Sequence, residues 1–191
     1  MKLLNVVVGY HGCPRYVGEK VLLSEHEHLL PSANPWDWLG GGVYFWEDNP
    51  QRALEWAKKN KQISDPFVIG AMIRTEDCLD LTEVKSIDLL KYSYNSLKQR
   101  LDKAGTPLPE NKPFGEDDKD EVRRYLDCAV IENAHETLKE SGQPPYASVR
   151  GIFSEGLPIF SGAEIHSMSH AQIAVRDTRS ILAYFRPRSA E

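Results

Sequence analysis

Two short segments near the N-terminus hold residues whose types and spacing could bind a planar, polar ligand. The first is the run YHG at residues 10–12, where the His11 imidazole can form hydrogen bonds and Gly12 lets another group approach the backbone closely. The second is the run GGGVYFWE at residues 40–47, where the Tyr44 ring offers a face for stacking on a planar, partly cationic ring.

A third segment, the run HAQIAV at residues 170–175, lies near the C-terminus. On a strand, His170 and Gln172 point to the same face because successive side chains alternate. Each feature alone has an ordinary structural explanation: His11 as a satisfied histidine in a strand, the glycines as a turn or bulge, and Tyr44 as a core aromatic residue. The order of the three segments along the chain favours a shared ligand site.

The patterning around these segments indicates an α+β fold. Short apolar runs predict strands at residues 3–8, 43–46, 67–73, 149–153, 158–160, 172–175 and 181–185. Helical periodicity predicts helices at about residues 17–28, from Pro50 onward, at 87–104 and at about 118–140. The last two strands are expected to be neighbours, and the YHG run is expected at the end of the first strand, which Gly9 bounds.

The second segment leads directly into one of these helices. Pro50 suits the first helical position, where its missing N–H has no intrahelical partner to lose. Ala53, Trp56 and Ala57 then lie on one face of the helix.

Taken in order, the segments resemble the His–Tyr–Glu branch of the ADP-ribosyltransferase fold, the branch of diphtheria toxin and the poly(ADP-ribose) polymerases. That family opens its NAD site with a strand ending in His-Gly and continues with Gly-x-Gly-[Ile/Val]-Tyr-Phe and a helix. It closes with a strand that bears a glutamate, followed by an apolar strand. The resemblance covers about half of the chain by position. It implies a split β-sandwich of short strands, with the helical middle, about residues 76–148, as an insertion.

The resemblance also implies a role for each matched residue, with NAD as substrate and no metal. His11 would hydrogen-bond the adenine-side ribose through an imidazole nitrogen acting as donor. Gly12 would hold the nicotinamide carboxamide through its backbone N–H and C=O, and Tyr44 would lie against the nicotinamide ring.

The family's glutamate falls on Gln172 in this chain. In the family, that carboxylate hydrogen-bonds the nicotinamide-side ribose and stabilises the positive charge that develops as nicotinamide leaves. A glutamine keeps the hydrogen bonds but has no charge and cannot act as a base. Three interpretations follow: Gln172 orients the ribose while the acceptor or a carboxylate (Glu47, Glu155 or Glu164) supplies the rest, the domain binds NAD or ADP-ribose without turnover, or the register of this strand differs. The first is favoured.

Other positions also depart from the family pattern. A second family tyrosine, on the far side of the nicotinamide, falls on Glu55, so Trp56 or Trp46 would have to take the stacking role. Cys13 stands where the family has a hydroxyl side chain after His-Gly. His170 could contact the acceptor or the ribose, or could be a solvated histidine at a strand start.

The leading hypothesis is a mono-ADP-ribosyltransferase with Gln172, His11 and Tyr44 as its catalytic residues, acting on a macromolecular acceptor, protein or nucleic acid. Residues 154–169 would form the acceptor-recognition loop. A bacterial toxin or defence role is a plausible context, with an antitoxin or immunity protein as a possible partner. The alternatives are a silent NAD- or ADP-ribose-binding module that acts through a partner, and an unrelated α+β interaction protein that uses its two amphipathic helices.

Bulk properties limit these classes. The 191 residues fit a single domain, 1–191, with 41% hydrophobic and 27% charged residues, which is ordinary globular composition. The net charge of −5 disfavours broad, non-specific nucleic-acid binding. The three cysteines include no CxxC pair that would suggest a zinc site, and no segment has the apolar length of a membrane span. We therefore expect a cytoplasmic protein without membrane contact.

Overall fold

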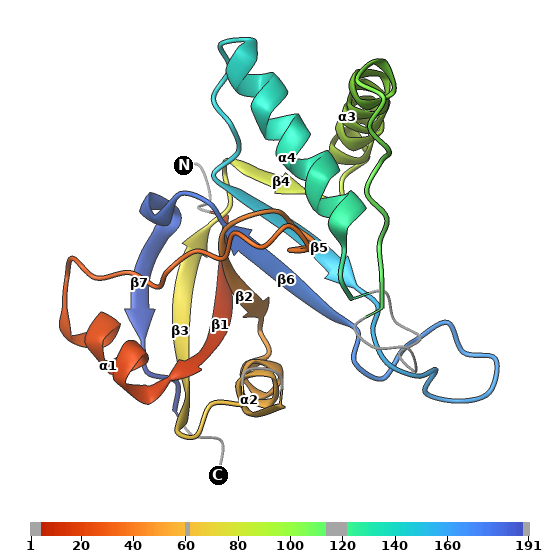
Figure 1. The fold of residues 1–191 in the computed structure, drawn as a ribbon. Coiled ribbons are helices and arrows are strands. Elements are labelled where there is room, and N and C mark those ends of the chain that lie inside the picture. The colour runs from red at the N-terminus through yellow and green to blue at the C-terminus, as the bar shows by residue number, and fades with distance from the viewer. Residues whose placement is uncertain (1–4, 60–61, 114–121, 189–191) are drawn as a thin grey trace.

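The chain folds around a seven-stranded sheet with helices against both of its faces (Figure 1). The computed structural model describes residues 5–59, 62–113 and 122–188. Helices and strands are mixed within these residues, and the α+β class predicted from the patterning is confirmed.

Strands occupy both ends of the chain, and the two longest helices lie in its middle. The strands are β1 Val6–Pro14, β2 Val43–Glu47, β3 Pro66–Arg74, β4 Cys78–Asp80, β5 Ser148–Phe153, β6 His170–Val175 and β7 Ile181–Phe185. The helices are α1 Arg15–Leu23, α2 Pro50–Lys59, α3 Val84–Lys103 and α4 Tyr125–Glu140, with a 3-10 turn at Thr178–Ser180. The middle of the chain is therefore helical as expected, and it also contributes the short strand β4.

The sheet has the order β4-β5-β6-β2-β1-β3-β7, and every neighbouring pair is antiparallel except β4 and β5. Strands β1 and β3 stay paired along the whole of both strands. By contrast, β1 and β2 are in register only at Gly9↔Glu47 and Tyr10↔Trp46. The sheet thus opens between β1 and β2 beyond Tyr10. The split sandwich implied by the resemblance is not seen among the described residues: the strands form one hydrogen-bonded sheet with a local opening, and not two packed sheets.

Each face of the sheet has its own apolar core. On one face, α1 packs over a core that includes Phe45, Ile69 and Ile173, each fully buried. On the other face, α4 packs through Ile131 against Leu39, Leu79, Val149 and Ala174. Helix α2 also lies on this second face, because a Cβ built on Gly12 of β1 would stand only 2.1 Å from the Ala53 carbonyl oxygen. The glycine therefore lets the helix backbone lie directly on the strand.

Helices α3 and α4 are joined by a buried polar contact. The Ser93 hydroxyl donates to the Val130 carbonyl (2.7 Å), and the Asn133 amide donates to the Ser93 carbonyl and hydroxyl oxygens (3.0 Å each). These bonds hold the two helices in one relative position, since breaking them would leave the buried Ser93 hydroxyl and Asn133 N–H groups unpaired. Among the described residues, no helix combines the length and apolar character needed to cross a bilayer.

The predicted pairing of the last two strands is wrong. Strand β6 lies between β2 and β5, and β7 pairs with β3 at the far edge of the sheet. Five of the six β6 residues are buried, as in a strand with neighbours on both sides, whereas Leu182 and Ala183 of β7 are exposed, as at an edge. Residues 176–180 therefore connect two strands that are not neighbours.

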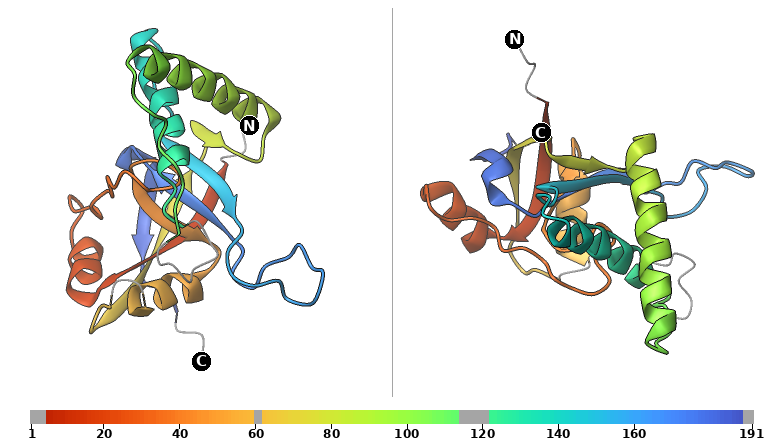
Figure 2. Two further views of the ribbon diagram at one scale, coloured as in Figure 1. Left: turned by 45° about the vertical axis from the view of Figure 1, so that its right-hand side comes forward. Right: turned by 90° about the horizontal axis from the view of Figure 1, so that it is seen from above.

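Two other predicted strands also differ from the structure. Strand β1 runs through Gly9 to Pro14 because β3 pairs with it over that whole length, so His11 and Gly12 lie inside the strand and not at its end. Residues 158–160 form no strand; Pro158 makes one isolated bridge to His166, and the neighbouring apolar side chains are exposed. They belong to the loop 154–169, which projects from the body in Figures 1 and 2.

Two predicted helices begin or end elsewhere. Helix α1 spans Arg15–Leu23 and not residues 17–28, since the chain after Ser24 is extended. Helix α4 begins at Tyr125. The predicted start of that helix at about residue 118, like the first two residues of the predicted strand 3–8, lies outside the described residues.

Candidate functional site

The three sequence segments come together on adjacent strands. Segment 10–12 lies on β1, Tyr44 on β2 and Gln172 on β6, and these strands are neighbours in the order β6-β2-β1. Trp46 is in register with Tyr10 on one side and with Gln172 on the other. Tyr44, Trp46 and Gln172 consequently share one face of the sheet, the face on which α2 and α4 lie.

Gly12 presents its backbone polar groups toward the opening between β1 and β2. The carbonyl of Val8 accepts a hydrogen bond from the backbone N–H of Asp48, just after β2, so Val8 points its polar groups toward that strand (2.9 Å). Backbone direction alternates along a strand, so Tyr10 and Gly12 point the same way. Tyr10 still pairs with β2, but among the described residues no register pair joins Gly12 to it. A ligand amide could therefore pair with Gly12 as an added strand would.

His11 lies beside the same opening, but its ring points to the α1 face of the sheet, opposite the side chains of Tyr44 and Gln172. Its Nδ1 is 2.7 Å from the Tyr44 carbonyl oxygen, and its ring meets the Phe45 ring edge-on with centroids 5.9 Å apart. A carbonyl only accepts, so Nδ1 carries the hydrogen. In the neutral ring Nε2 is then an acceptor.

Tyr44 is held by its hydroxyl. The phenol accepts from the Leu39 backbone N–H (2.9 Å) and donates to the Gly40 carbonyl (2.8 Å). Gly40 takes a φ of 75°, which suits glycine and lets the loop turn back over the tyrosine. Burial, together with the nearby Asp37, raises the pKa of Tyr44 well above its usual range, so the hydroxyl remains a donor. Tyr44 thus fixes the glycine-rich loop, and its ring packs against the core on the α4 side of the sheet.

Gln172 is buried, with 7% of its surface exposed, and its Oε1 accepts a hydrogen bond from the Trp38 indole N–H (2.7 Å). Trp38 lies over Gly151 of β5, where a Cβ would be 3.0 Å from its ring, and against Phe153, with ring centroids 4.8 Å apart. The indole thus fixes which end of the carboxamide is the oxygen. Sequence reasoning did not single out Trp38; its only sequence signal was its place just before the glycine run.

An aromatic group continues from Gln172 along the sheet. Trp46 lies between Trp56 of α2 (ring centroids 5.6 Å apart) and His170 (6.3 Å). His170 is 8% exposed and its Nδ1 donates to the Met168 carbonyl (2.7 Å). Burial lowers the pKa of His170, with a further contribution from the positive charge of Arg52, so the neutral ring is favoured near pH 7. His170 is thus a buried neutral histidine and not a solvated one.

The carboxylates considered as substitutes for the family glutamate are engaged elsewhere or distant. Arg150 binds Glu47 through two hydrogen bonds (2.6 and 3.0 Å), on the face opposite Gln172. Arg52 of α2 binds Glu155 (2.9 Å). Glu164 is exposed on the projecting loop. Two of the three are thus paired with arginine, and the third is exposed to solvent.

Other expected contacts also differ. Glu55, at the position of the second family tyrosine, bonds Arg52 (3.2 Å), whereas Trp56 faces Trp46. Cys13 is buried in the core on the α1 side, and burial raises the pKa of its thiol to about 11. Cys13 is therefore an unreactive core residue on the face opposite Gln172.

A clamp joins the glycine-rich loop to the helical insertion. Glu132 of α4 accepts from the Gly41 backbone N–H (2.8 Å) and from both terminal nitrogens of Arg176 (2.6 and 2.9 Å). Arg176 also donates to the Gly41 carbonyl (3.1 Å). Although burial alone would raise it, these hydrogen bonds hold the pKa of Glu132 below its usual range. Sequence reasoning also missed this clamp, since nothing local links positions 132 and 176.

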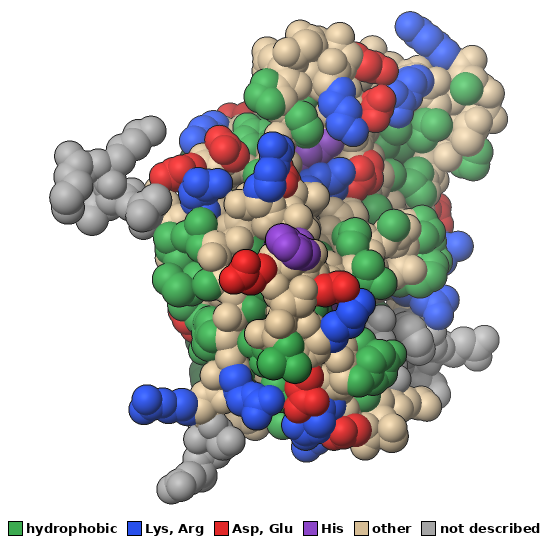
Figure 3. Space-filling model, turned by 90° about the vertical axis from the view of Figure 1, so that its left-hand side faces the viewer, with side chains coloured by type: hydrophobic (Ala, Val, Ile, Leu, Met, Phe, Trp, Pro, Cys, Tyr) green, Lys and Arg blue, Asp and Glu red, His purple; other side chains and the backbone are tan. Residues whose placement is uncertain are grey.

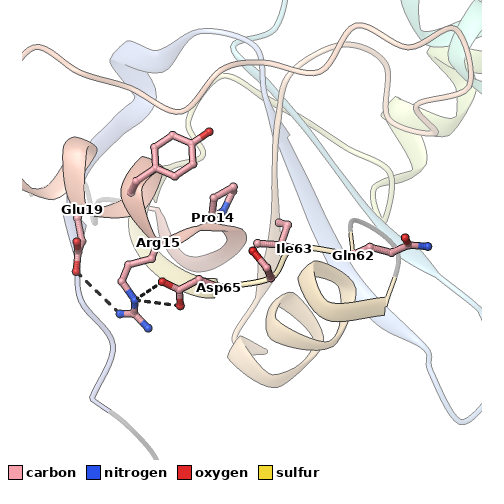
Figure 4. Close-up of a pocket in the computed structure, with 8 residues that line it drawn as sticks. Pro14, Arg15, Glu19, Gln62, Ile63 and Asp65 are labelled. Atoms are coloured by element: carbon pink, nitrogen blue, oxygen red, sulfur yellow. Dashed lines mark hydrogen bonds and ion pairs between the residues drawn. The ribbon is translucent and has the colours of Figure 1, made fainter.

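Two hollows lie among the described residues, and neither is lined by His11, Gly12, Tyr44 or Gln172. The first has a volume of about 440 Å³ and lies where β1 passes into α1, two residues beyond Gly12. Arg15 in its wall forms ion pairs with Asp65 (3.0 Å) and Glu19 (3.9 Å) (Figure 4). The second, about 570 Å³, lies between α3 and α4 and has Trp38 in its wall. Across the described residues, no group of three or more His, Cys, Asp or Glu could hold a metal ion.

Comparison with known proteins shows similarity to a protein of an archaeon. The chain is similar to an uncharacterized protein, MJ0359, of Methanocaldococcus jannaschii, with 32% identity over 104 residues. The alignment covers 49% of this chain and 47% of that protein, so the chain matches about half the length of its relative. No family model and no solved structure matches the chain.

Proposed function

We propose that the chain is a mono-ADP-ribosyltransferase, which cleaves NAD between nicotinamide and ribose and transfers ADP-ribose to a protein. The observation that supports this most directly is the opening between β1 and β2. His11 and the Gly12 backbone line it, Tyr44 borders it, and Gln172 follows on the next strand. The sequence resemblance assigns NAD contacts to these same four positions.

Each of these groups has a chemical task in the proposed reaction. The Gly12 N–H and C=O match the C=O and NH₂ of a carboxamide, and the Tyr44 ring offers a stacking face for the nicotinamide. Trp38 orients the Gln172 carboxamide through a hydrogen bond of 2.7 Å. In the proposed reaction this carboxamide hydrogen-bonds the ribose hydroxyls. Holding the ribose while nicotinamide is replaced by an acceptor is a proximity effect that needs no charge at position 172.

The loop 154–169 supports a protein as the acceptor. Leu157, Ile159, Phe160 and Ile165 are between 51% and 69% exposed. A cluster of large apolar side chains on a projecting loop is typical of a protein-binding surface. The face drawn in Figure 3, which is turned away from this loop, has Lys and Arg side chains interspersed with Asp and Glu. A toxin or defence role, with a neutralising partner, stays a prediction.

The test is incubation of the purified chain with NAD and cell lysate. We expect nicotinamide release and a mass shift of one ADP-ribose on a lysate protein, both lost in His11→Ala. His26→Ala is the matched control, because His26 is exposed in the segment after α1. NAD that binds without nicotinamide release would refute transfer, and a chain that does not bind NAD would refute the site.

A silent NAD- or ADP-ribose-binding module is the second candidate. The buried, uncharged Gln172 and the arginine-bound carboxylates around the site favour it. Such a module would bind NAD in a titration and release no nicotinamide, and it would gain turnover when Gln172 is changed to glutamate. Turnover by the unchanged chain would exclude it.

A further inference from the structure

Two buried ring nitrogens beside Gln172 have no hydrogen-bond partner among the described residues. They are Nε1 of Trp46 and Nε2 of His170. The two side chains are 4% and 8% exposed. Buried polar atoms are nearly always paired, so two unpartnered ones on neighbouring rings mark a candidate place for a further hydrogen-bonding group.

The two nitrogens have opposite hydrogen-bonding roles. The indole Nε1 of Trp46 can only donate. Nδ1 of His170 donates to the Met168 carbonyl (2.7 Å), so Nε2 of the neutral ring can only accept. The two rings are neighbours, with centroids 6.3 Å apart and planes tilted by 44°. A group that accepts from one and donates to the other is a hydroxyl.

The pair lies where an attacking group is needed. Trp46 is the register partner of Gln172, and His170 precedes Gln172 by two residues on the same face of β6. That spacing puts the Cα atoms of His170 and Gln172 about 7 Å apart. His170 is also the first strand residue after the loop 154–169, so an acceptor bound to that loop would reach the sheet at this point.

We propose that Trp46 and His170 bind the hydroxyl group of a serine or threonine of the acceptor protein, and that His170 removes its proton. This inference rests on the proposed function, since it names the acceptor chemistry of the same site. Burial lowers the pKa of His170, which leaves Nε2 unprotonated near neutral pH.

The step balances without any further reactant. The bond between C1 of the ribose and the pyridinium nitrogen breaks, and its electron pair leaves with neutral nicotinamide. The acceptor oxygen forms the new bond to C1. The hydroxyl proton passes to Nε2 of His170, and the imidazolium later releases it to solvent.

Other acceptor groups fit the pair less well. An ionised carboxylate only accepts, so it would face the His170 lone pair without a hydrogen to donate. A guanidinium only donates, so it offers nothing to the Trp46 N–H, and it would need a carboxylate base. The nearby carboxylates, Glu55 and Glu155, are both bound by Arg52 (3.2 and 2.9 Å).

The charges that face His170 set its pH dependence. Arg52 reaches it from α2, and its partners Glu55 and Glu155 offset part of that positive charge. Trp46 from β2 and Phe153 from β5 add no charge. Transfer to a hydroxyl should therefore fall as acid protonates His170, and it should lose this pH dependence when the histidine is replaced.

The experiment supplies NAD together with small acceptor mimics: N-acetylserinamide, the α-amide of N-acetylglutamate (which keeps its side-chain carboxylate), and agmatine. Nicotinamide release is followed by chromatography and the adducts by mass spectrometry. The wild type is compared with His170→Gln, which keeps an acceptor oxygen but cannot take up a proton, with Trp46→Phe, and with His26→Ala as control. Thermal melting verifies that each variant folds.

We expect adducts on the serine mimic at least tenfold in excess of those on the other two. His170→Gln should lower the rate of serine transfer at least tenfold and abolish its acid limb, and Trp46→Phe should raise KM for the mimic more than it lowers kcat. Equal transfer to the glutamate mimic or agmatine, free ADP-ribose as the only product, or undiminished transfer by His170→Gln would overturn the inference while NAD cleavage stands. No NAD binding and no nicotinamide release would instead overturn the proposed function.

Discussion

Replacing Tyr44 by phenylalanine removes one oxygen atom and tests what holds the glycine-rich loop. That oxygen accepts from the Leu39 N–H and donates to the Gly40 carbonyl, and Leu39 is fully buried. A hydrogen bond contributes about 1 kcal/mol, and a buried group left unpaired costs about 1–3 kcal/mol. Tyr44→Phe should therefore lower the free energy of unfolding by about 2–4 kcal/mol. At about 2–4 °C per kcal/mol for a chain of this size, the melting temperature should fall by at least about 4 °C.

Measuring NAD affinity distinguishes the contribution of the Tyr44 ring from that of its hydroxyl. Tyr44→Phe keeps the stacking ring, so NAD affinity should fall only a few-fold, whereas Tyr44→Ala should weaken it at least about tenfold, which corresponds to 1.4 kcal/mol. Urea unfolding followed by tryptophan fluorescence and calorimetric titration with NAD measure the two effects, and Tyr16→Phe, at a position 75% exposed, is the control. Unchanged stability of Tyr44→Phe would refute the role of the hydroxyl. A folded Tyr44→Ala that binds NAD like the wild type would refute the placement of the site.

Three further changes test the surroundings of the site. Gln172→Glu, whose carboxylate would keep the Trp38 hydrogen bond, should increase nicotinamide release about tenfold or more, and a folded variant with an unchanged rate would contradict this. Glu132→Gln keeps an acceptor for the Gly41 N–H but loses the charge paired with Arg176. We expect the free energy of unfolding, measured with urea, to fall by about 1 kcal/mol and NAD binding to weaken a few-fold. Unchanged NAD affinity would show that the clamp does not affect the site. Burial lowers the pKa of His135 to about 4, below the usual value near 6.5. As the pH drops, the unfolded chain therefore takes up this proton before the folded chain does. The free energy of unfolding should fall by up to about 3 kcal/mol between about pH 6.5 and pH 4. His135→Leu should flatten that part of the urea stability profile, and a slope that persists would assign it to other groups.

The elements that local patterning determines were predictable from the sequence. The strand of Tyr44 and the helix after it are present, with Ala53 and Ala57 fully buried on the face that the spacing indicated. The strand of Gln172 is present as well, and its register beside β2 follows from the structure alone. Hydrophobic period and cap residues act over a few positions, which explains why a single sequence carries these features.

The rest depends on contacts between distant residues. Strand β1 continues past Gly9 because β3 pairs with it, and a Cβ at Gly9 would stand only 2.6 Å from the Phe45 Cβ. The glycine marks a close approach inside the sheet, whereas the pattern suggested a strand end. Trp38 and Gln172 are 134 positions apart, and Glu132 and Arg176 are 44 apart, so neither pair leaves a local signal.

The charges around the site explain why position 172 matters so much. Arg150 binds Glu47, Arg52 binds Glu155, and Arg176 binds Glu132, each with a nitrogen–oxygen distance of 2.6 to 2.9 Å. A carboxylate neutralised in this way contributes little to the field at a neighbouring sugar, because the arginine's charge opposes it. In the proposed reaction, the described groups beside Gln172 that could respond to positive charge on the ribose are neutral dipoles and the His170 lone pair. A carboxylate at position 172 would supply a negative charge there. None of the described residues considered for this role supplies one.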